Sequence, residues 1–127
     1  MKNLLVLGTS DKSEYSKGYF TKFGDGCADL LPISNLYKTQ IREFAKILGI
    51  PDNIITKKSS PNLWKDHDAE DEIGINYEEI DSILYCLEKR LTIDEIIKKT
   101  EIKKESVEKI YQMYQNTQHK RILPERV

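Results

Sequence analysis

Residues 4–10 read Leu4-Leu5-Val6-Leu7-Gly8-Thr9-Ser10, a continuous apolar run that ends at a glycine. A short, wholly apolar run of this kind is typical of a buried strand in a parallel sheet. Such a strand needs neighbours on both sides. The stretch therefore predicts an α/β fold in which this strand belongs to a parallel sheet.

Outward from this run, residues 10–29 show no sustained periodicity and contain three glycines. We expect an ordered loop with one helical turn near Ser13. Loops of this length in a compact domain are usually functional. Ligands in open parallel sheets collect at the carboxyl ends of strands, so Thr9 is a candidate nucleotide contact. A simple strand-ending turn explains the same residues.

Helical spacing of apolar residues predicts that most of the remaining chain is helical. Asn35 is the expected cap of the first long helix, Asn76 caps a later one, and Thr92 with Glu95 fits a capping box. A long loop is expected over 57–74. The predicted helical segments are about 36–48, a short turn at 51–55, one after Asn76, one from Thr92 to about Lys99, and about 104–115.

The bulk composition fits one small soluble domain. The chain has 127 residues, of which 39% are hydrophobic and 32% charged, with a formal net charge of −1. A chain with this charge balance has no overall electrostatic attraction for nucleic acid or for an anionic membrane. No run approaches the roughly 18 apolar residues of a membrane helix. The apolar stretch at the start of the sequence is too short for a signal peptide and has no small-residue cleavage site, so we expect no signal peptide.

The two cysteines, Cys27 and Cys86, form neither a metal-ligand pair nor a disulfide framework. We expect free thiols and a cytoplasmic location, because reducing compartments keep thiols unpaired. Cys86 falls on an apolar helical face and is expected in the core.

Several polar residues are candidates for chemistry, each with a plainer explanation. Glu14 could hold Mg²⁺ against phosphate oxygens, or be a solvated loop glutamate. Lys38 opens a helix, where the dipole disfavours lysine, so it either reaches for phosphate or is simply exposed. Residues 21–29 mix charges, glycines and aromatics, which suits a ligand surface or a surface hairpin. His67 lies in an acidic loop, and one histidine does not make a metal site.

The order and spacing of these residues resemble the second half of NAD synthetases. The resemblance is carried by Gly8-Thr9-x4-Glu14, by Gly18-Tyr19-Phe20-Thr21-Lys22-Phe23-Gly24-Asp25-Gly26-x2-Asp29, by Leu36-x-Lys38-Thr39-Gln40, by Asp71-Glu72-x-Gly74-Ile75-x-Tyr77-x2-Ile80-Asp81, and by His119-Lys120-Arg121-x2-Pro124. It runs along nearly the whole chain. The block from Tyr19 to Asp29 and the closing His-Lys-Arg motif are its most specific parts.

The resemblance implies that residues 1–127 are the carboxy-terminal part of a synthetase domain, with a partial doubly wound parallel sheet of the ATP-pyrophosphatase type. It also implies an ATP- and Mg²⁺-dependent ligase that uses ammonia to convert deamido-NAD to NAD. An adenylated intermediate forms on the way, and AMP and pyrophosphate are released. Family members are commonly homodimers.

Site residues follow from the matching positions. The resemblance places Thr9, Lys38 and Ser60 at ATP and Glu14 at Mg²⁺. It places four residues at deamido-NAD: Lys22, Asp29, His119 and Lys120. It assigns no catalytic residue.

The chain departs from the family pattern in two ways. Cys27 stands where glycine is common, which would strain the backbone if that position needs a positive φ. The Ser-Gly-Gly-x-Asp-Ser loop, which cradles pyrophosphate in the family, does not occur in this sequence. We therefore expect no activity from the chain alone, and either a complementary amino-terminal segment or a second copy as its partner.

Two other functional hypotheses remain open at this point. The chain could be an inactive or regulatory subunit that only binds nucleotide. Alternatively, residues 91–113 resemble a helix-turn-helix that bears Lys103, Lys104 and Lys109. Acidic residues on the same segment and the near-neutral chain argue against DNA binding.

Overall fold

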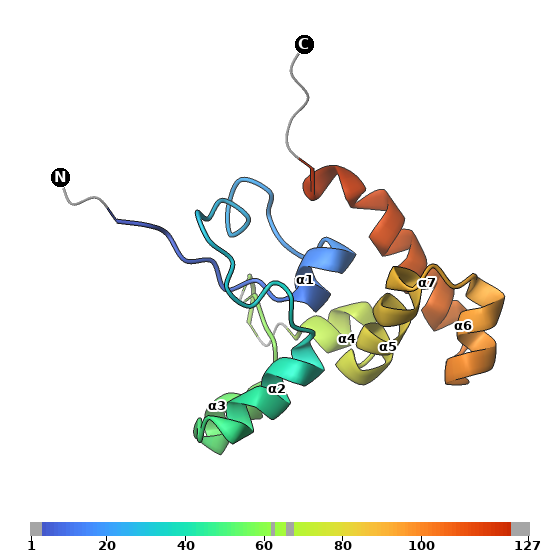
Figure 1. The fold of residues 1–127 in the computed structure, drawn as a ribbon, viewed down its shortest axis with the longest axis horizontal. Helices are drawn as coiled ribbons and strands as arrows, with labels where there is room; N and C mark the ends of the chain where they lie inside the picture. Colours follow the sequence, from blue (N-terminus) through green and yellow to red (C-terminus); the bar gives the residue numbers. More distant parts are fainter. Residues whose placement is uncertain (1–3, 62, 66–67, 123–127) are drawn as a thin grey trace, which may run out of the picture.

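The computed structural model describes residues 4–61, 63–65 and 68–122 (Figure 1). An extended amino-terminal segment and a long loop lead from one side of the molecule to a group of packed helices. The helices, in chain order, are α1 (Lys12–Lys17), α2 (Lys38–Ile47), α3 (Asp52–Ile55), α4 (Ala69–Ile73), α5 (Tyr77–Glu88), α6 (Ile93–Thr100), α7 (Lys104–Asn116) and the 3-10 turn η1 (Gln118–Lys120).

The core lies around α5, which contacts α1, α2, α6 and α7. Its apolar face packs against isoleucine and valine side chains of α6 and α7, as the helical spacing predicts. Cys86 is buried in the same cluster, which confirms its predicted place. The residues with no exposed area in this cluster are Ile80, Ile83, Ile96, Val107 and Ile110.

Two of the predicted helix starts are confirmed by their hydrogen bonds. The Asn76 side chain accepts from the Glu79 N–H at 2.8 Å, which caps α5. Thr92 and Glu95 form the expected capping box at the start of α6. The short helix expected over 51–55 is also present as α3. Local sequence signals therefore define this part of the fold.

The predicted start of α2 is wrong. Asn35 does not cap it, and the helix begins only at Lys38. The reason is that its first amide groups find partners elsewhere in the chain. Ser13 Oγ accepts from the Lys38 N–H at 2.9 Å, and an Asp81 carboxylate oxygen accepts from the Thr39 N–H at 2.9 Å.

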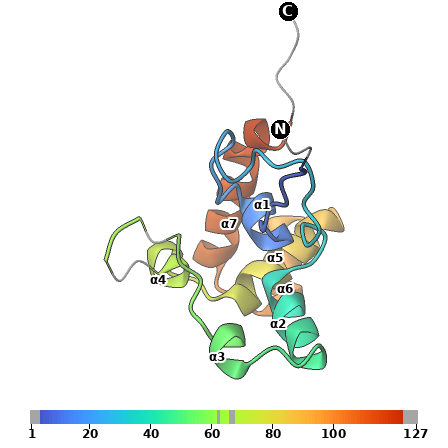
Figure 2. The same ribbon diagram turned by 90° about the vertical axis from the view of Figure 1, so that its left-hand side faces the viewer.

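The loop expected over 57–74 is interrupted by α4. The Asp68 side chain caps this helix by accepting from the Glu70 and Asp71 N–H groups. Figure 2 shows α2 and α3 side by side, and the described part of the loop before α4 extending away from the other helices. His67 lies outside the described residues.

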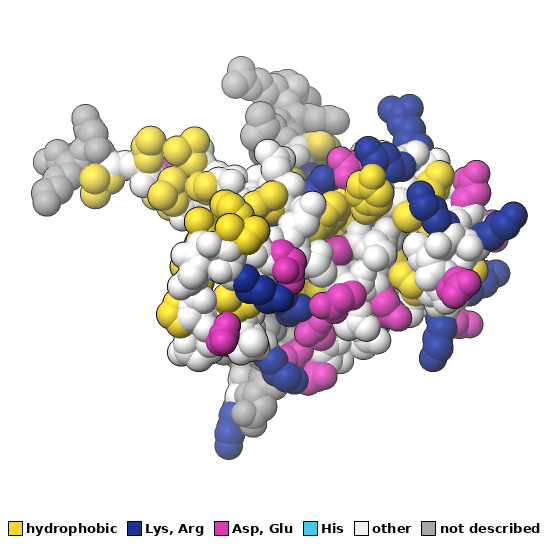
Figure 3. Space-filling view, turned by 60° about the horizontal axis from the view of Figure 1, so that its bottom comes forward, with side chains coloured by type: hydrophobic (Ala, Val, Ile, Leu, Met, Phe, Trp, Pro, Cys, Tyr) yellow, Lys and Arg dark blue, Asp and Glu magenta, His cyan; other side chains and the backbone are white. Residues whose placement is uncertain are grey.

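The amino-terminal run is not the buried strand that its composition predicts. Its only paired partner among the described residues is Leu30, through an isolated parallel bridge to Leu7. Leu4 to Leu7 are 57–78% exposed. Figure 3 shows hydrophobic side chains gathered over this segment. A strand is buried only when neighbours cover it, so the parallel sheet stays a prediction.

Within the described ranges, no helix has the length and apolar character that crossing a membrane requires.

Candidate functional site

The first cluster forms where α1 begins. Asp11 precedes the helix in an extended conformation, and its Oδ1 accepts from the Glu14 N–H at 2.8 Å. In return, Glu14 Oε2 accepts from the Asp11 N–H at 3.2 Å. This reciprocal capping box fixes the Glu14 side chain at the helix start. The structure thus gives Glu14 a defined orientation, which a solvated loop residue would lack.

Lys38 meets both of these carboxylates. Its Nζ lies 2.5 Å from Asp11 Oδ2 and 3.0 Å from Glu14 Oε1. Partial burial of the ammonium acts to lower its pKa, but the charges of Asp11 and Glu14 outweigh this, so the pKa of Lys38 is raised. Lys38 is therefore a fixed cation at the amino end of α2. Glu14 and Lys38, which the sequence analysis named separately, lie side by side.

A second lysine is buried beneath this ion pair. Lys17 has no exposed area, and its Nζ donates to the Tyr77 hydroxyl at 3.1 Å. The same ammonium lies 4.2 Å from the centroid of the Tyr77 ring, within the range of a cation–π contact. Burial lowers the pKa of Lys17 to about 8, although nearby Asp11 and Glu14 act in the opposite direction.

Asp81 ties the cluster to the core helix α5. Its carboxylate accepts from the Ser13 hydroxyl and from the Thr39 N–H. Burial raises the pKa of Asp81, and these two hydrogen bonds oppose the shift. One buried carboxylate therefore joins α1, α2 and α5, which explains why the amino ends of α1 and α2 meet.

The second cluster joins the loop after α1 to the end of the described chain. Lys120 Nζ donates to the carbonyl oxygens of Gly18 and Phe20 at 2.8 and 2.9 Å. Lys22 Nζ donates to the His119 carbonyl at 2.7 Å. Residues that are about 100 positions apart in the chain are thus held together. Three of the four residues predicted at deamido-NAD lie in this cluster.

Arg121 reinforces this cluster from the helical side. Its guanidinium donates to the Ser16 carbonyl at 2.6 Å, at the carboxyl end of α1, and also to the Tyr114 carbonyl in α7. In the sequence, Arg121 is recognisable only as part of the His-Lys-Arg motif. Its role here is to join α1 to α7.

The other predicted site residues lie apart from these contacts. Asp29 Oδ2 accepts from the Val6 N–H at 2.7 Å, which fixes it beside the amino-terminal segment. Thr9 is exposed on the same segment, and Ser60 is half-buried in the loop before α4. The structure therefore brings Glu14 and Lys38 together, and Lys22, His119 and Lys120 together, but it does not place Thr9 or Ser60 in either group.

A metal ion at this site would need ligands from a substrate in addition to those from the protein. In the part of the chain that the structure describes, no three His, Cys, Asp or Glu side chains are placed to hold a metal ion by themselves. Mg²⁺ is commonly bound through one or two carboxylates together with phosphate and water oxygens. The Glu14 carboxylate, which is 23% exposed beside a lysine, fits that kind of site.

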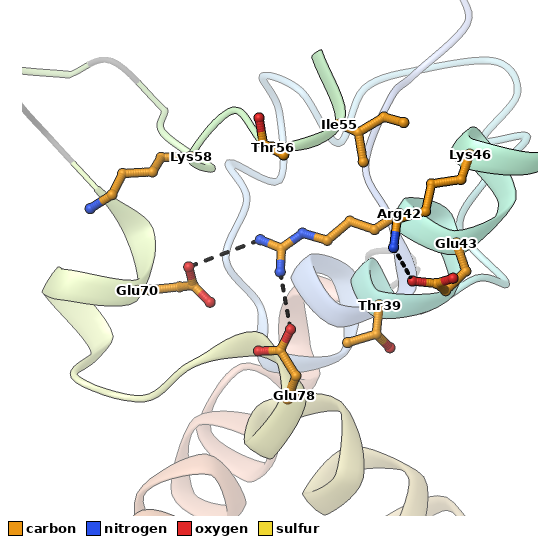
Figure 4. A pocket seen from close by; sticks show the side chains of 9 residues that line it. All are labelled: Thr39, Arg42, Glu43, Lys46, Ile55, Thr56, Lys58, Glu70 and Glu78. Atoms are coloured by element: carbon orange, nitrogen blue, oxygen red, sulfur yellow. Dashed lines mark hydrogen bonds and ion pairs between the residues drawn. The ribbon is translucent and has the colours of Figure 1, made fainter. Parts of the chain in front are cut away.

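A hollow of about 450 Å³ lies between α2, α3, α4 and α5, and none of the predicted site residues lines it (Figure 4). Its central side chain is Arg42, whose guanidinium lies 3.4 Å from Glu78 and 3.9 Å from Glu70. Lys46 pairs with Glu43 at 2.6 Å. The hollow therefore has both of these cations beside carboxylates, and it lies apart from the positions that the family pattern assigns to the ligands.

Two concerns from the sequence are answered by the backbone and by side-chain contacts. The backbone at Cys27 is not among the positive-φ positions of the described chain, so this residue causes no such strain. Of the three lysines on the possible helix-turn-helix, Lys109 donates to the Ile73 carbonyl and Lys104 pairs with Glu108. These contacts do not favour a DNA-binding face.

Sequence reasoning missed the residues that hold the site together. Asp11, Lys17 and Tyr77 are central in the structure, but none was named as a functional residue. The spacing of Asp11 and Glu14 is a capping-box signal that could have been read directly. No local signal points to the contacts of Lys17 and Tyr77, which are 60 residues apart.

Comparisons with known proteins give one consistent result. Residues 1–124 match the family model described as NAD synthase. An NH(3)-dependent NAD(+) synthetase of Saccharolobus solfataricus is 52% identical over 126 residues, which is 98% of this chain and 45% of the relative. A second one, from Hyperthermus butylicus, is 50% identical over 98% of this chain and 45% of its own length.

Solved structures agree with the sequence relatives. An NMN synthetase from Francisella tularensis superposes with a TM-score of 0.79 at 37% identity, covering 98% of this chain and 47% of the other. An NH3-dependent NAD synthetase from Campylobacter jejuni, in complex with the nitrate ion, has a TM-score of 0.73 at 32% identity, over 99% and 46%. The chain spans slightly less than half the length of these relatives.

Proposed function

This chain belongs to the NAD synthase family, and from that premise we propose that it supplies one face of a site that amidates deamido-NAD to NAD. The reaction uses ATP and ammonia. The observation that carries the proposal is the contact between Glu14 and Lys38 at 3.0 Å. These are the two residues that the family pattern assigns to Mg²⁺ and to the ATP phosphates, and they come from different elements.

The chemistry requires that a poor electrophile be activated. The nicotinate carboxylate of deamido-NAD attacks the α-phosphorus of ATP, which forms an adenylate and releases pyrophosphate. Ammonia then attacks the carboxyl carbon, a proton is lost, and AMP leaves with the former carboxylate oxygen. Mg²⁺, when bound at Glu14, offsets negative charge on the pyrophosphate leaving group.

Lys38 would contact the phosphates from the protein side. Its ammonium is held by Asp11 and Glu14, so it is already oriented before ATP arrives. A group that is fixed in advance loses less conformational freedom when it binds its ligand. In this proposal Thr9 and Ser60 also contact ATP, from the amino-terminal segment and from the loop before α4.

Lys22, Asp29, His119 and Lys120 would hold deamido-NAD. An ammonium has three N–H donors. Among the described residues, Lys120 uses two of its donors on backbone carbonyls and Lys22 uses one. Each lysine therefore keeps a donor for a phosphate or carboxylate oxygen, while the same side chain fixes the shape of the loop around it.

Catalysis is proposed to require the other side of the site. The Ser-Gly-Gly-x-Asp-Ser loop of the family is not in these 127 residues. We infer that a polypeptide segment carrying that loop, or a homodimer completed by it, supplies the grip on pyrophosphate. A nucleotide-binding subunit without turnover is the alternative.

The test is an assay of NAD formation from deamido-NAD, ATP and ammonia. The 127-residue chain is measured alone and together with a separately prepared segment that carries the Ser-Gly-Gly-x-Asp-Ser loop. We expect NAD only from the mixture. Turnover by the chain alone would contradict the need for a second side, and binding without turnover in the mixture would favour the nucleotide-binding alternative.

A second candidate reaction is the formation of NMN. It is favoured by the likeness to the Francisella tularensis NMN synthetase at 37% identity, although the NAD synthetase of Saccharolobus solfataricus is more similar, at 52%. The two candidates differ in whether the adenylyl half of the dinucleotide is present on the substrate. Supplying the mononucleotide and the dinucleotide carboxylates in the same assay distinguishes them by the product formed.

A further inference from the structure

We propose that Asp11 is the positioning residue that holds Glu14 and Lys38 in a single geometry, and so determines where the ATP phosphates would lie. The inference deepens the proposed function and rests on it for the identity of the ligand. Asp11 itself is too deeply buried to contact ATP, since its side chain is only 1% exposed.

The two oxygens of the Asp11 carboxylate have different partners. Oδ1 accepts from the Glu14 N–H at 2.8 Å and thereby caps α1. Oδ2 lies 2.5 Å from the Nζ of Lys38, which belongs to α2. The ring is closed by Glu14, which accepts from the Asp11 N–H at 3.2 Å and from Lys38 at 3.0 Å. Three charged groups from two elements therefore fix one another.

Burial makes Asp11 the stronger of the two anchors. Glu14 is 23% exposed, so solvent screens its attraction to Lys38, whereas the Asp11 carboxylate is almost fully enclosed. Lys38 also sits in the first turn of α2, where the helix dipole disfavours a cation. A buried carboxylate at 2.5 Å supplies the compensating charge.

A purely structural role for Asp11 is the competing explanation, because it also caps α1. The two roles can be separated chemically. Asparagine caps helices about as well as aspartate, since its side-chain oxygen accepts the same hydrogen bond. Asp11→Asn therefore keeps the cap on α1 and removes the charge that faces Lys38.

Asp68 provides a matched control elsewhere in the chain. It is also a buried aspartate that caps a short helix, and it also pairs with a lysine, Lys58, at 3.2 Å. Asp68→Asn removes the same charge in the same kind of local structure. It leaves the contacts of Lys38 unchanged.

Two measurements on the full chain test the proposal. The first is the rate at which acetic anhydride acetylates Lys38, read by mass spectrometry of digested protein. The second is the dissociation constant of MgATP, measured by calorimetry. We expect Asp11→Asn to raise the labelling rate of Lys38 about tenfold and to weaken MgATP binding about tenfold, because the buried ion pair that orients Lys38 is lost. Asp68→Asn should leave the labelling rate of Lys38 unchanged.

The sign of the MgATP result is decisive. Removing a negative charge near a phosphate site would by itself tighten the binding of ATP. Weaker binding therefore supports positioning, whereas tighter or unchanged binding overturns it, as does unchanged labelling of Lys38. If the wild-type chain binds no MgATP, the proposed function fails and the labelling result alone decides the role of Asp11. Asp11→Ser, which also keeps a capping oxygen, repeats the test if Asp11→Asn does not fold.

Discussion

The helices α5, α6 and α7 and the amino-terminal segment 4–9 are stabilised in opposite ways. Ile80, Ile96 and Ile110 in the helices have no exposed area. In the segment, Leu4 and Leu5 are 78% and 68% exposed, and the chain is held by a few backbone and polar contacts. The comparison teaches that the helices form the folded scaffold. The candidate site is attached to it through buried polar groups.

The largest expected effect contrasts one substitution at two places. Ile80→Ala creates a cavity in the core around α5 and should lower the free energy of unfolding by about 3 kcal/mol. Ile47→Ala in α2, where the side chain is 80% exposed, should change it by less than about 0.5 kcal/mol. Urea unfolding of both variants checks the contrast. Equal losses would show that α2 is packed as tightly as α5.

The buried Lys17 should make the free energy of unfolding depend on pH, with a somewhat smaller effect. Burial lowers the pKa of Lys17 to about 8, so the folded chain loses this proton while the unfolded chain keeps it up to pH 10.5. The unfolded state therefore binds more protons between these values, and stability rises with pH in that window. Relative to Lys17→Met, the wild-type free energy of unfolding should rise by about 2 kcal/mol from pH 7 to 10.

The control for this prediction is Lys98→Met, which removes an exposed lysine from α6. Its difference from the wild type should stay flat over the same pH range, because this exposed side chain has none of the burial that Lys17 has. A flat difference for Lys17→Met as well would mean that Lys17 keeps its charge in the folded chain.

Loss of the hydrogen bonds between Lys120 and the loop after α1 should have a more local effect. Lys120→Met removes the hydrogen bonds to the carbonyls of Gly18 and Phe20. We expect a loss of about 1 kcal/mol in stability and faster amide hydrogen exchange over residues 18–22. The exposed Lys99 in α6 provides the matched variant Lys99→Met, which should leave that exchange unchanged. Unchanged exchange in Lys120→Met would show that the loop is held by other contacts.

The smallest expected effect is a gain in stability. Glu101 ends α6 with a φ of 58°, in the left-handed region that glycine adopts without strain. Glu101→Gly should raise the free energy of unfolding by about 0.5 kcal/mol. Glu105→Gly in the first turn of α7 should lower it by a similar amount, because glycine disfavours the helical conformation and the acidic side chain that suits a helix start is lost. Thermal unfolding of the two variants tests the opposite signs.

The same comparison explains how much could be predicted from the sequence. α5 and α6 were found because Asn76 and Thr92 cap them through neighbours three residues away. The start of α2 was missed because its partners, Ser13 and Asp81, are 25 and 42 residues distant. Local patterns report local contacts well and cannot report which distant side chain satisfies a helix end.

The candidate site shows the same limit. Glu14, Lys38 and Lys120 were named from their spacing, but the carboxylate that holds the first two, Asp11, was not. The apolar run Leu4 to Leu7 predicted burial, and these side chains are exposed. An apolar composition indicates that a segment tends to be buried. Whether it is buried depends on other segments of the protein, which the run itself does not specify.

The most direct test of the central claim is calorimetric titration of deamido-NAD into the full chain. The account predicts that the wild type binds, that Lys22→Met and Asp29→Asn each weaken binding about tenfold or more, and that Lys99→Met binds like the wild type. A wild-type chain that binds no deamido-NAD, or Lys22 and Asp29 variants that bind it equally well, would contradict the assignment of this face to the dinucleotide.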